Sequence, residues 1–208
     1  MNVSTNVLKR FVIYMAILTF VMFTVWGFVR SFMDRPAGDY ETEVCDIRLK
    51  DKKYDQALEA ANEALNKTPY HRGAMMCKAL VFISQKNYID ADRTLSSLIV
   101  FLEKNLEEDD RTGIGTLAAS YANRGIIKDR NKNYEGALQD YARALGIDQE
   151  AVAGPGLGTI ILNYKFKSSS VKERALYLNE QLQLPEDERV LSIKELDEGQ
   201  VMHKPGKL

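Results

Sequence analysis

The chain has 208 residues, which is enough for one domain with a smaller appendage. Its 28 Lys and Arg residues nearly balance its 29 Asp and Glu residues, and the net charge of −1 argues against a dedicated nucleic-acid binder, because such domains are normally basic. Two cysteines and two histidines are too few for a disulfide scaffold or a histidine-rich metal site. These averages hide an uneven distribution of apolar residues, which are concentrated near the N-terminus.

Residues 11–29 form an uncharged run of nineteen residues that is bounded by basic residues on both sides. A helix of this length spans roughly the hydrocarbon core of a bilayer, and this one is apolar on every face. We therefore expect residues 1–35 to be a membrane anchor with a short leader, in contact with the lipid bilayer through residues 11–33.

Two other interpretations of this run are possible and less favoured. A buried core helix is disfavoured by the length of the run. A cleaved signal peptide usually has an apolar region of about 7–15 residues that ends in small residues. This run is longer and its end reads Phe28-Val29-Arg30-Ser31, so a signal peptide is disfavoured.

The orientation of the anchor rests on a thin charge bias. Two basic residues precede the apolar run and two follow it within the first 35 positions, and the N-terminal amine tips the balance toward an internal N-terminus. The sequence thus predicts a single-pass protein of a bacterial inner membrane whose remaining part is periplasmic. That part carries 24 basic and 28 acidic residues, once the four basic and one acidic residues of positions 1–35 are removed.

A Tyr-x-x-Ala motif recurs along the rest of the chain. The first two copies are 34 residues apart, and the third follows after 46, which is one period plus a twelve-residue insertion. The three pairs are Tyr54 with Ala57, Tyr88 with Ala91, and Tyr134 with Ala137. Each copy is predicted to be a pair of helices; in the first copy these cover about 40–50 and 54–67, with a turn between them and Pro69 after them.

These residues resemble the tetratricopeptide-repeat (TPR) family, whose 34-residue unit has small, aromatic, Ala and Pro residues at fixed positions. The matching residues are Cys45, Tyr54, Ala57, Ala64 and Pro69 in the first unit; Ala79, Phe82, Tyr88, Ala91 and Leu95 in the second; and Tyr121, Gly125, Tyr134, Ala137, Tyr141 and Ala144 in the third. The chain departs from the pattern at Ala61, Leu98, Glu103 and Gln149.

The resemblance implies an all-α fold: a single N-terminal transmembrane helix followed by a short, right-handed TPR-type solenoid. The units would cover 38–71, 72–105 and 118–151 within a domain 36–151, with an insertion at 106–117 and a capping helix pair at 152–185. Within that pair we expect helices over about 159–166 and 171–184. Residues 186–208 would be a loosely ordered tail with a short helix near its start.

The second unit has Glu103 where the family has the proline that would end its second helix. We expect that helix to run on to about Glu107, and the acidic run 107–110 to end it unfavourably against the helix dipole. Residues 111–115, which contain two glycines, are predicted to be a flexible joint. The insertion is interpreted as a longer linker between two units, and a loop that contacts a partner protein is the alternative.

No catalytic or metal-binding motif is present in the sequence. His71 is interpreted as an exposed turn residue. Cys45 and Cys77 fall on the first helices of neighbouring units, where buried thiols are expected; a disulfide is the alternative if the domain is periplasmic. The sequence therefore predicts an interaction protein rather than an enzyme, with no cofactor.

The resemblance also implies a concave groove lined by the first helix of each unit. The groove positions with the most informative chemistry are Asp46, Leu49, Met76, Leu80, Ile83, Ile126, Asp129 and Arg130. An apolar middle with charged ends suits an apolar or amphipathic peptide segment. The alternative is that these apolar residues pack against the C-terminal capping helices. A carboxylate clamp of the chaperone-binding kind is not expected, because Thr42 and Asp46 stand at two of its positions.

These features together predict a membrane-anchored scaffold or assembly factor that captures a partner segment in its groove. Its partners would be peptide segments of other proteins or subunits of a membrane complex. The alternative function is a permanent accessory or structural subunit docked through the membrane helix, where Ala16, Thr19 and Gly27 give a weak stripe of small residues.

Overall fold

The computed structural model describes residues 5–33, 35–150, 152, 170–193, 200 and 202–203. The chain divides into two compact units, Met1–Ala37 and Gly38–Leu208, and each is described by itself. The helix predicted over 159–166 lies outside the described residues.

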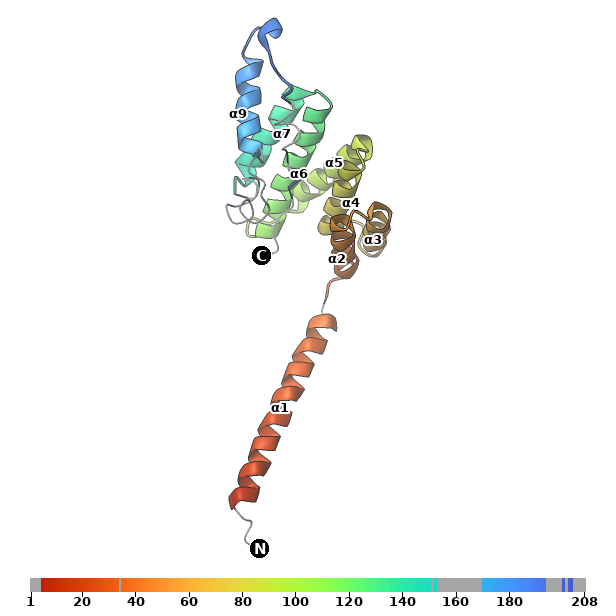
Figure 1. The fold of residues 1–208 in the computed structure, drawn as a ribbon, viewed down its shortest axis with the longest axis vertical. Coiled ribbons are helices and arrows are strands. Elements are labelled where there is room, and N and C mark those ends of the chain that lie inside the picture. The colour runs from red at the N-terminus through yellow and green to blue at the C-terminus, as the bar shows by residue number, and fades with distance from the viewer. Residues whose placement is uncertain are drawn as a thin grey trace. The chain divides into compact units, whose positions relative to one another are not determined.

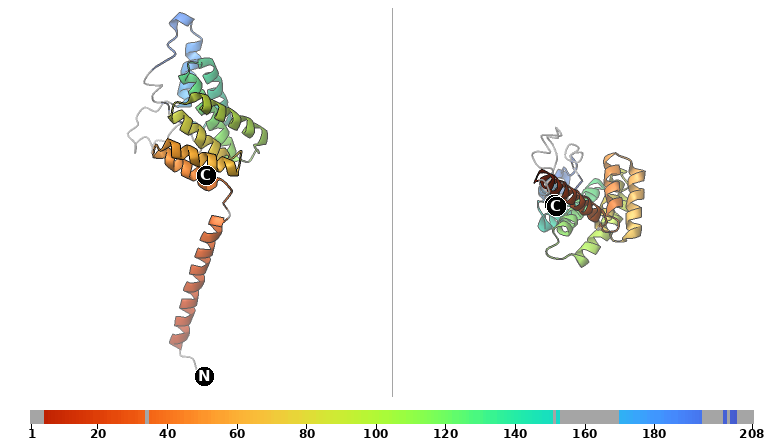
Figure 2. Two further views of the ribbon diagram at one scale, coloured as in Figure 1. Left: turned by 90° about the vertical axis from the view of Figure 1, so that its right-hand side faces the viewer. Right: turned by 90° about the horizontal axis from the view of Figure 1, so that it is seen from below.

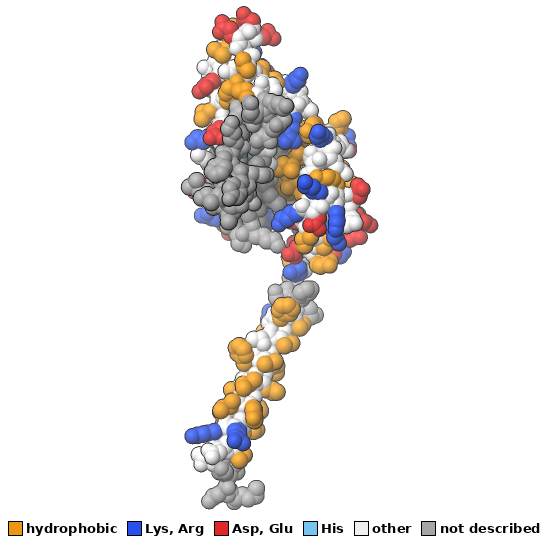
Figure 3. Space-filling view, in the orientation of Figure 1, with side chains coloured by type: hydrophobic (Ala, Val, Ile, Leu, Met, Phe, Trp, Pro, Cys, Tyr) orange, Lys and Arg blue, Asp and Glu red, His pale blue; other side chains and the backbone are white. Residues whose placement is uncertain are grey.

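The first unit is the single helix α1, Thr5–Met33 (Figure 1). Its side chains from Thr5 to Arg30 are all exposed, and Figure 3 shows apolar side chains along the visible face with basic ones near the N-terminal end. A helix that is apolar and exposed on all sides has no polar face to present to water. It is long and apolar enough to cross a membrane.

The second unit is built from helical hairpins, with no strand among the residues that the structure describes. Its helices are α2 (Asp39–Lys50), α3 (Tyr54–Lys67), α4 (Arg72–Ser84), α5 (Tyr88–Asn105), α6 (Arg111–Arg130), α7 (Tyr134–Ile147) and α9 (Val171–Leu182), followed by the 3₁₀ turn η1 (Glu186–Glu188). Each helix from α2 to α7 contacts the next, and α2 also contacts α4 while α4 contacts α6. This is the arrangement of stacked TPR-like hairpins, and Figures 1 and 2 show the pairs following one another.

The first two hairpins are joined by a disulfide between Cys45 on α2 and Cys77 on α4. The expectation of two free thiols was therefore wrong. The helices meet through small residues, so that the two Cα atoms lie 6.4 Å apart, within the range that a disulfide bridges.

The larger core lies among α4, α5, α6, α7 and α9. Gly125 on α6 permits a close approach of α7 in it, because a Cβ atom there would lie 2.6 Å from two ring carbons of Tyr141 on α7. The small residue expected at this position is thus required by the packing of the aromatic ring opposite.

The insertion is helical over most of its length, which differs from the flexible joint predicted at 111–115. Helix α5 ends at Asn105, and α6 begins at Arg111 with Asp110 as its N-cap, which accepts a hydrogen bond from the Gly113 N–H at 2.8 Å. The same carboxylate forms an ion pair with Arg72. The acidic run therefore precedes the positive end of α6, where negative charge is favourable, rather than ending α5.

His71 also differs from its expected role as an exposed turn residue. Its side chain is only 14% exposed and caps α4, with Nδ1 accepting from the Ala74 N–H and Nε2 donating to Asp39. It is a structural cap that ties the first two hairpins together.

Helix α9 covers one side of α7 and begins with a capping box between Ser170 and Glu173. Of its apolar residues, Ala175 and Leu178 are buried in the larger core. The buried Arg174 next to them was not anticipated, and it belongs to the site described below.

Candidate functional site

The eight predicted groove residues fall into two groups in the structure. Five are buried, and the remaining three are half-buried. The buried residues are Met76, Leu80, Ile83, Ile126 and Asp129, and the half-buried ones are Asp46, Leu49 and Arg130. The apolar floor of the predicted groove is therefore part of the protein core.

The chain's own C-terminal segment covers part of this floor. His203 lies against Asn123 on α6: the Asn123 amide donates to the His203 carbonyl at 2.7 Å, and its oxygen accepts the His203 N–H at 2.8 Å. Asn123 is fully buried, and it also donates a weak bond to the sulfur of Met76 on α4. Met202 packs against the same core. The expected loosely ordered tail is thus wrong for Met202 and His203.

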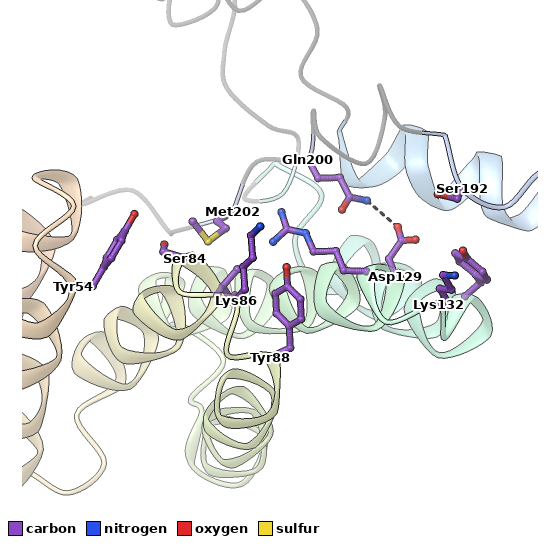
Figure 4. Close-up of a pocket in the computed structure, with 12 residues that line it drawn as sticks. Tyr54, Ser84, Lys86, Tyr88, Asp129, Lys132, Ser192, Gln200 and Met202 are labelled. Atoms are coloured by element: carbon purple, nitrogen blue, oxygen red, sulfur yellow. Dashed lines mark hydrogen bonds between the residues drawn. The ribbon is translucent and has the colours of Figure 1, made fainter.

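Gln200 extends this contact toward the end of α6. Its amide donates to Asp129 at 2.8 Å and to the Tyr141 hydroxyl at 3.2 Å. Figure 4 shows the Gln200 and Asp129 side chains pointing toward one another across the pocket edge. Segments about 70 residues apart in sequence therefore meet on this face.

Asp129, predicted as a groove contact, is the centre of a buried ion pair. Arg174 donates to its two carboxylate oxygens from Nε and Nη2, both at 2.7 Å, and the two side chains are 1% and 3% exposed. Tyr141 donates to the same carboxylate at 3.1 Å, and burial, with the negative charge of Asp129, raises the pKa of Tyr141 well above its usual value. Asp129 therefore holds α6, α7 and α9 together and has no free oxygen facing a ligand.

An open pocket remains beside this buried cluster, at the hairpin turns. Its volume is about 590 Å³, and it shares Ile83, Asp129 and Arg130 with the predicted groove. Its other main contributors are residues of the turns between the paired helices. These are Tyr54, Lys86, Tyr88, Lys132 and Tyr134. In Figure 4, Lys86 and Tyr88 rise from one turn toward the space below Gln200, while Lys132 lies at the next turn.

The three turns have the same backbone geometry. The residue two positions before each unit's tyrosine is a lysine with positive φ: Lys52 at 59°, Lys86 at 60° and Lys132 at 62°. Each lysine N–H bonds to the carbonyl three residues earlier, and the next N–H bonds to the carbonyl five residues earlier. This is the Schellman arrangement, in which the left-handed position usually has Gly.

Sequence reasoning missed the two pocket lysines because it compared only helix positions between the units. The signal was present, since Lys precedes each repeat tyrosine by two residues in all three units. The repeat tyrosines and the lysines two positions before them lie at or next to the turns between the paired helices. They are therefore outside the first-helix face to which the groove residues were assigned.

A second hollow, of about 690 Å³, lies along α5 and contains Tyr70 and Phe101, whose rings stack with centroids 5.0 Å apart. Its lining mixes apolar and basic side chains. It contains none of the predicted groove residues. Among the described residues, no three His, Cys, Asp or Glu side chains are grouped to hold a metal ion.

No protein-family model and no curated protein sequence matches the chain. Among solved structures, a similar one is the TPR domain of OM64 from Arabidopsis, with 16% sequence identity and a TM-score of 0.45. The likeness covers 55% of this chain and 84% of that domain. The description of the fold rests on the stacked hairpins themselves.

Proposed function

We propose that this protein is a membrane-anchored scaffold or assembly factor that captures a segment of a partner protein on the face formed by α4 and α6. Stacked helical repeats of this kind present extended surfaces to other proteins. A TPR-like fold supports a general role in binding other proteins, and we assign that role to the face of α4 and α6.

The observation that carries the proposal is the pair of hydrogen bonds between Asn123 and His203. They join a side-chain amide to both backbone groups of one residue, as a peptide-binding face does with an extended ligand. These bonds involve only the backbone atoms of His203, so a residue of a partner segment can make the same pair in its place. The face of α4 and α6 thus already holds a peptide segment, which is the chain's own.

Two features support the placement of this face outside the cytoplasm. Helix α1 has the length and composition of a membrane span. The disulfide between Cys45 and Cys77 suits an oxidising compartment such as the periplasm. Together with the charge bias at α1, they support an internal N-terminus and a periplasmic hairpin domain.

The test uses a labelled peptide of residues 198–208 and two forms of the protein in detergent, the full chain and a chain ending at residue 199. We expect the shortened chain to bind the peptide and the full chain to bind it much more weakly, because its own segment occupies the face. Replacing Asn123 with Ala in the shortened chain removes binding, whereas the exposed Asn62→Ala serves as the matched control. Absence of binding by a shortened chain that retains its helical circular dichroism would refute the proposal.

The alternative is a permanent subunit docked through α1, along the face of Ala16, Thr19 and Gly27. The open surface at Gly27, which has no atom within 4 Å of an added Cβ, favours it, but the Thr19 hydroxyl bonds its own helix at Met15. Co-purification from membranes separates the two functions. Loss of the partner with Gly27→Leu, but not with Asn123→Ala, favours docking through the membrane helix.

A further inference from the structure

We propose that the pocket at the hairpin turns recognises an acidic segment of a partner protein. We call it the basic tyrosine pocket and define it by Lys86, Arg130 and Lys132 together with Tyr54, Tyr88 and Tyr134. The inference rests on the proposed function in taking the ligand to be a protein segment, but it names a different set of residues and a chemistry for that segment.

Among the residues that the structure describes, the charged side chains that line the pocket are mainly basic. Its three cationic side chains make no ion pair within the part of the chain that the structure describes. Asp129 is the only carboxylate among the described residues that line the pocket, and Arg174 already bonds it twice. This cluster lies in a body that is acidic overall, with 24 basic and 28 acidic residues after position 35. A concave site lined by one sign of charge focuses its field on a ligand of the opposite sign.

The backbone shows that lysine is not at these turns for local stability. Lys86 and Lys132 have φ of 60° and 62°, a conformation that Gly adopts freely and that a residue with a Cβ disfavours. The neighbouring Asn87 and Asn133 cap the next helices, so the turn is complete without the lysine side chain. Lys52 shares this conformation outside the pocket, so the assignment of Lys86 and Lys132 to a binding role rests on their position in the pocket together with the backbone.

The tyrosines and Arg130 give the pocket its selectivity for carboxylates on a peptide. The Arg130 guanidinium lies 5.9 Å from the centroid of the Tyr88 ring, which orients its planar donors. The half-buried rings offer apolar surface to the aliphatic part of an acidic side chain, and the hydroxyl groups of Tyr54 and Tyr88 can donate to its oxygens. Carboxylates held by Arg and Lys together gain charge-assisted hydrogen bonds.

A peptide fits this pocket better than an anionic membrane surface does. The cations lie in a hollow that is also lined by Ser84, Gln200 and Met202 (Figure 4), and a flat layer of headgroups has no segment to insert there. Gln200 and Met202 belong to the segment that occupies the α4 and α6 face. A partner chain that replaces this segment would therefore continue directly into the basic tyrosine pocket.

The test exploits the unusual backbone of the turns. We compare the full chain with the variants Lys86→Gly and Lys132→Gly, and use Lys52→Gly as the control. Lys52 has the same conformation, but it lies outside the residues that line the pocket. Glycine removes the charge and suits the turn, so all three variants should keep or raise the melting temperature.

The probe is a fluorescent peptide of alternating Glu and Ala residues, with a Gln-for-Glu peptide as its uncharged match. The full chain is held in a phosphatidylcholine nanodisc. We expect binding of the acidic peptide only, weakened about 3- to 10-fold by each pocket variant and unchanged by Lys52→Gly. Raising the salt from about 50 mM to 300 mM should weaken it further, because the screening length shortens.

Equal losses in all three variants, unchanged binding in the pocket variants, or equal binding of the Gln peptide would each overturn the inference. So would phosphatidylglycerol vesicles that bind in place of the peptide with the same dependence on Lys86 and Lys132. The residue 198–208 peptide separates the two proposals. If it binds the shortened chain while the acidic peptide fails, the proposed function stands and this inference falls. If the acidic peptide binds while that peptide fails, the opposite holds.

Discussion

Replacing Asp129 with Asn should destabilise the hairpin domain severely, although the two side chains have nearly the same shape. The change removes the negative charge from a buried pair and leaves the positive charge of Arg174 in place. Arg174 is 1% exposed, so water cannot take the place of the lost carboxylate. A buried charge without its partner is among the few single changes that cost several kcal/mol.

The magnitude follows from the contacts of the Asp129 carboxylate. It accepts two bonds from Arg174 at 2.7 Å, one from Gln200 at 2.8 Å and one from Tyr141 at 3.1 Å. An Asn side chain keeps one oxygen and turns an amide donor toward the other donors. Breaking such a buried pair costs about 3–5 kcal/mol, against a total stability of about 5–15 kcal/mol for a typical domain. For a domain of this size the melting temperature should fall by roughly 6–20 °C.

Thermal unfolding followed by circular dichroism at 222 nm measures this effect on the full chain in detergent. The control is Asp90→Asn, because Asp90 also bonds an arginine, Arg93, but the pair is exposed, with side chains 38% and 73% accessible. That variant should lose at most about 1 kcal/mol. A further variant, Arg174→Met in the Asp129→Asn background, should lose less than the sum of the single changes, because no buried charge remains unpaired.

A melting temperature of Asp129→Asn within about 2 °C of that of the unchanged protein, or no lower than that of Asp90→Asn, would refute this prediction. The prediction also fails if the two changes at Asp129 and Arg174 are additive, since additivity would mean that the pair is not coupled.

Three further outcomes are expected. Gly125→Ala should cost about 1–3 kcal/mol of stability, because the new methyl group would lie 2.6 Å from the tyrosine ring and overpack the core. Gly146→Ala has open space around it and should gain about 0.5–1 kcal/mol. Melting temperatures in the reverse order would contradict this. Reducing the Cys45–Cys77 disulfide, which closes a sequence separation of 32 residues, should cost roughly 3–4 kcal/mol, so an unchanged melting temperature after reduction would count against the bond. Burial lowers the pKa of His203 to about 4 from its usual 6.5. The stability that the neutral ring contributes is therefore present above pH 6.5 and is lost toward pH 4, by up to roughly 3 kcal/mol; an NMR titration of His203 near 6.5 would refute this.

The parts of the fold that sequence alone predicted are those governed by local periodicity. The apolar run of α1 is recognisable because no face of it is polar. The hairpins follow from the spacing of Tyr54, Tyr88 and Tyr134, each of which begins a second helix in the structure. Such patterns act within one unit of about 34 residues, so they do not depend on how distant segments meet.

The features that sequence missed depend on contacts between distant residues. His203 bonds Asn123 across eighty positions, and nothing in the local sequence near the C-terminus distinguishes this segment from a free tail. The disulfide depended on how closely α2 and α4 approach, which is set by small residues on several helices. Asp110 was assigned to the wrong helix, because a cap is identified only when the start of the next helix is known.

The burial of the predicted groove residues has a physical reason that also explains why the candidate site lies at the turns. A face carrying Met76, Leu80 and Ile83 is apolar, and a short array has few neighbouring units to cover it, so exposure to water would be costly. The chain covers this core with α9 and with residues near its own C-terminus. The basic tyrosine pocket at the edge of this face stays accessible, and it carries the positive charges of Lys86, Arg130 and Lys132. Under the two proposals, a partner segment would compete with the chain's own residues for the backbone bonds at this apolar face. Its acidic side chains would then select it at the basic edge.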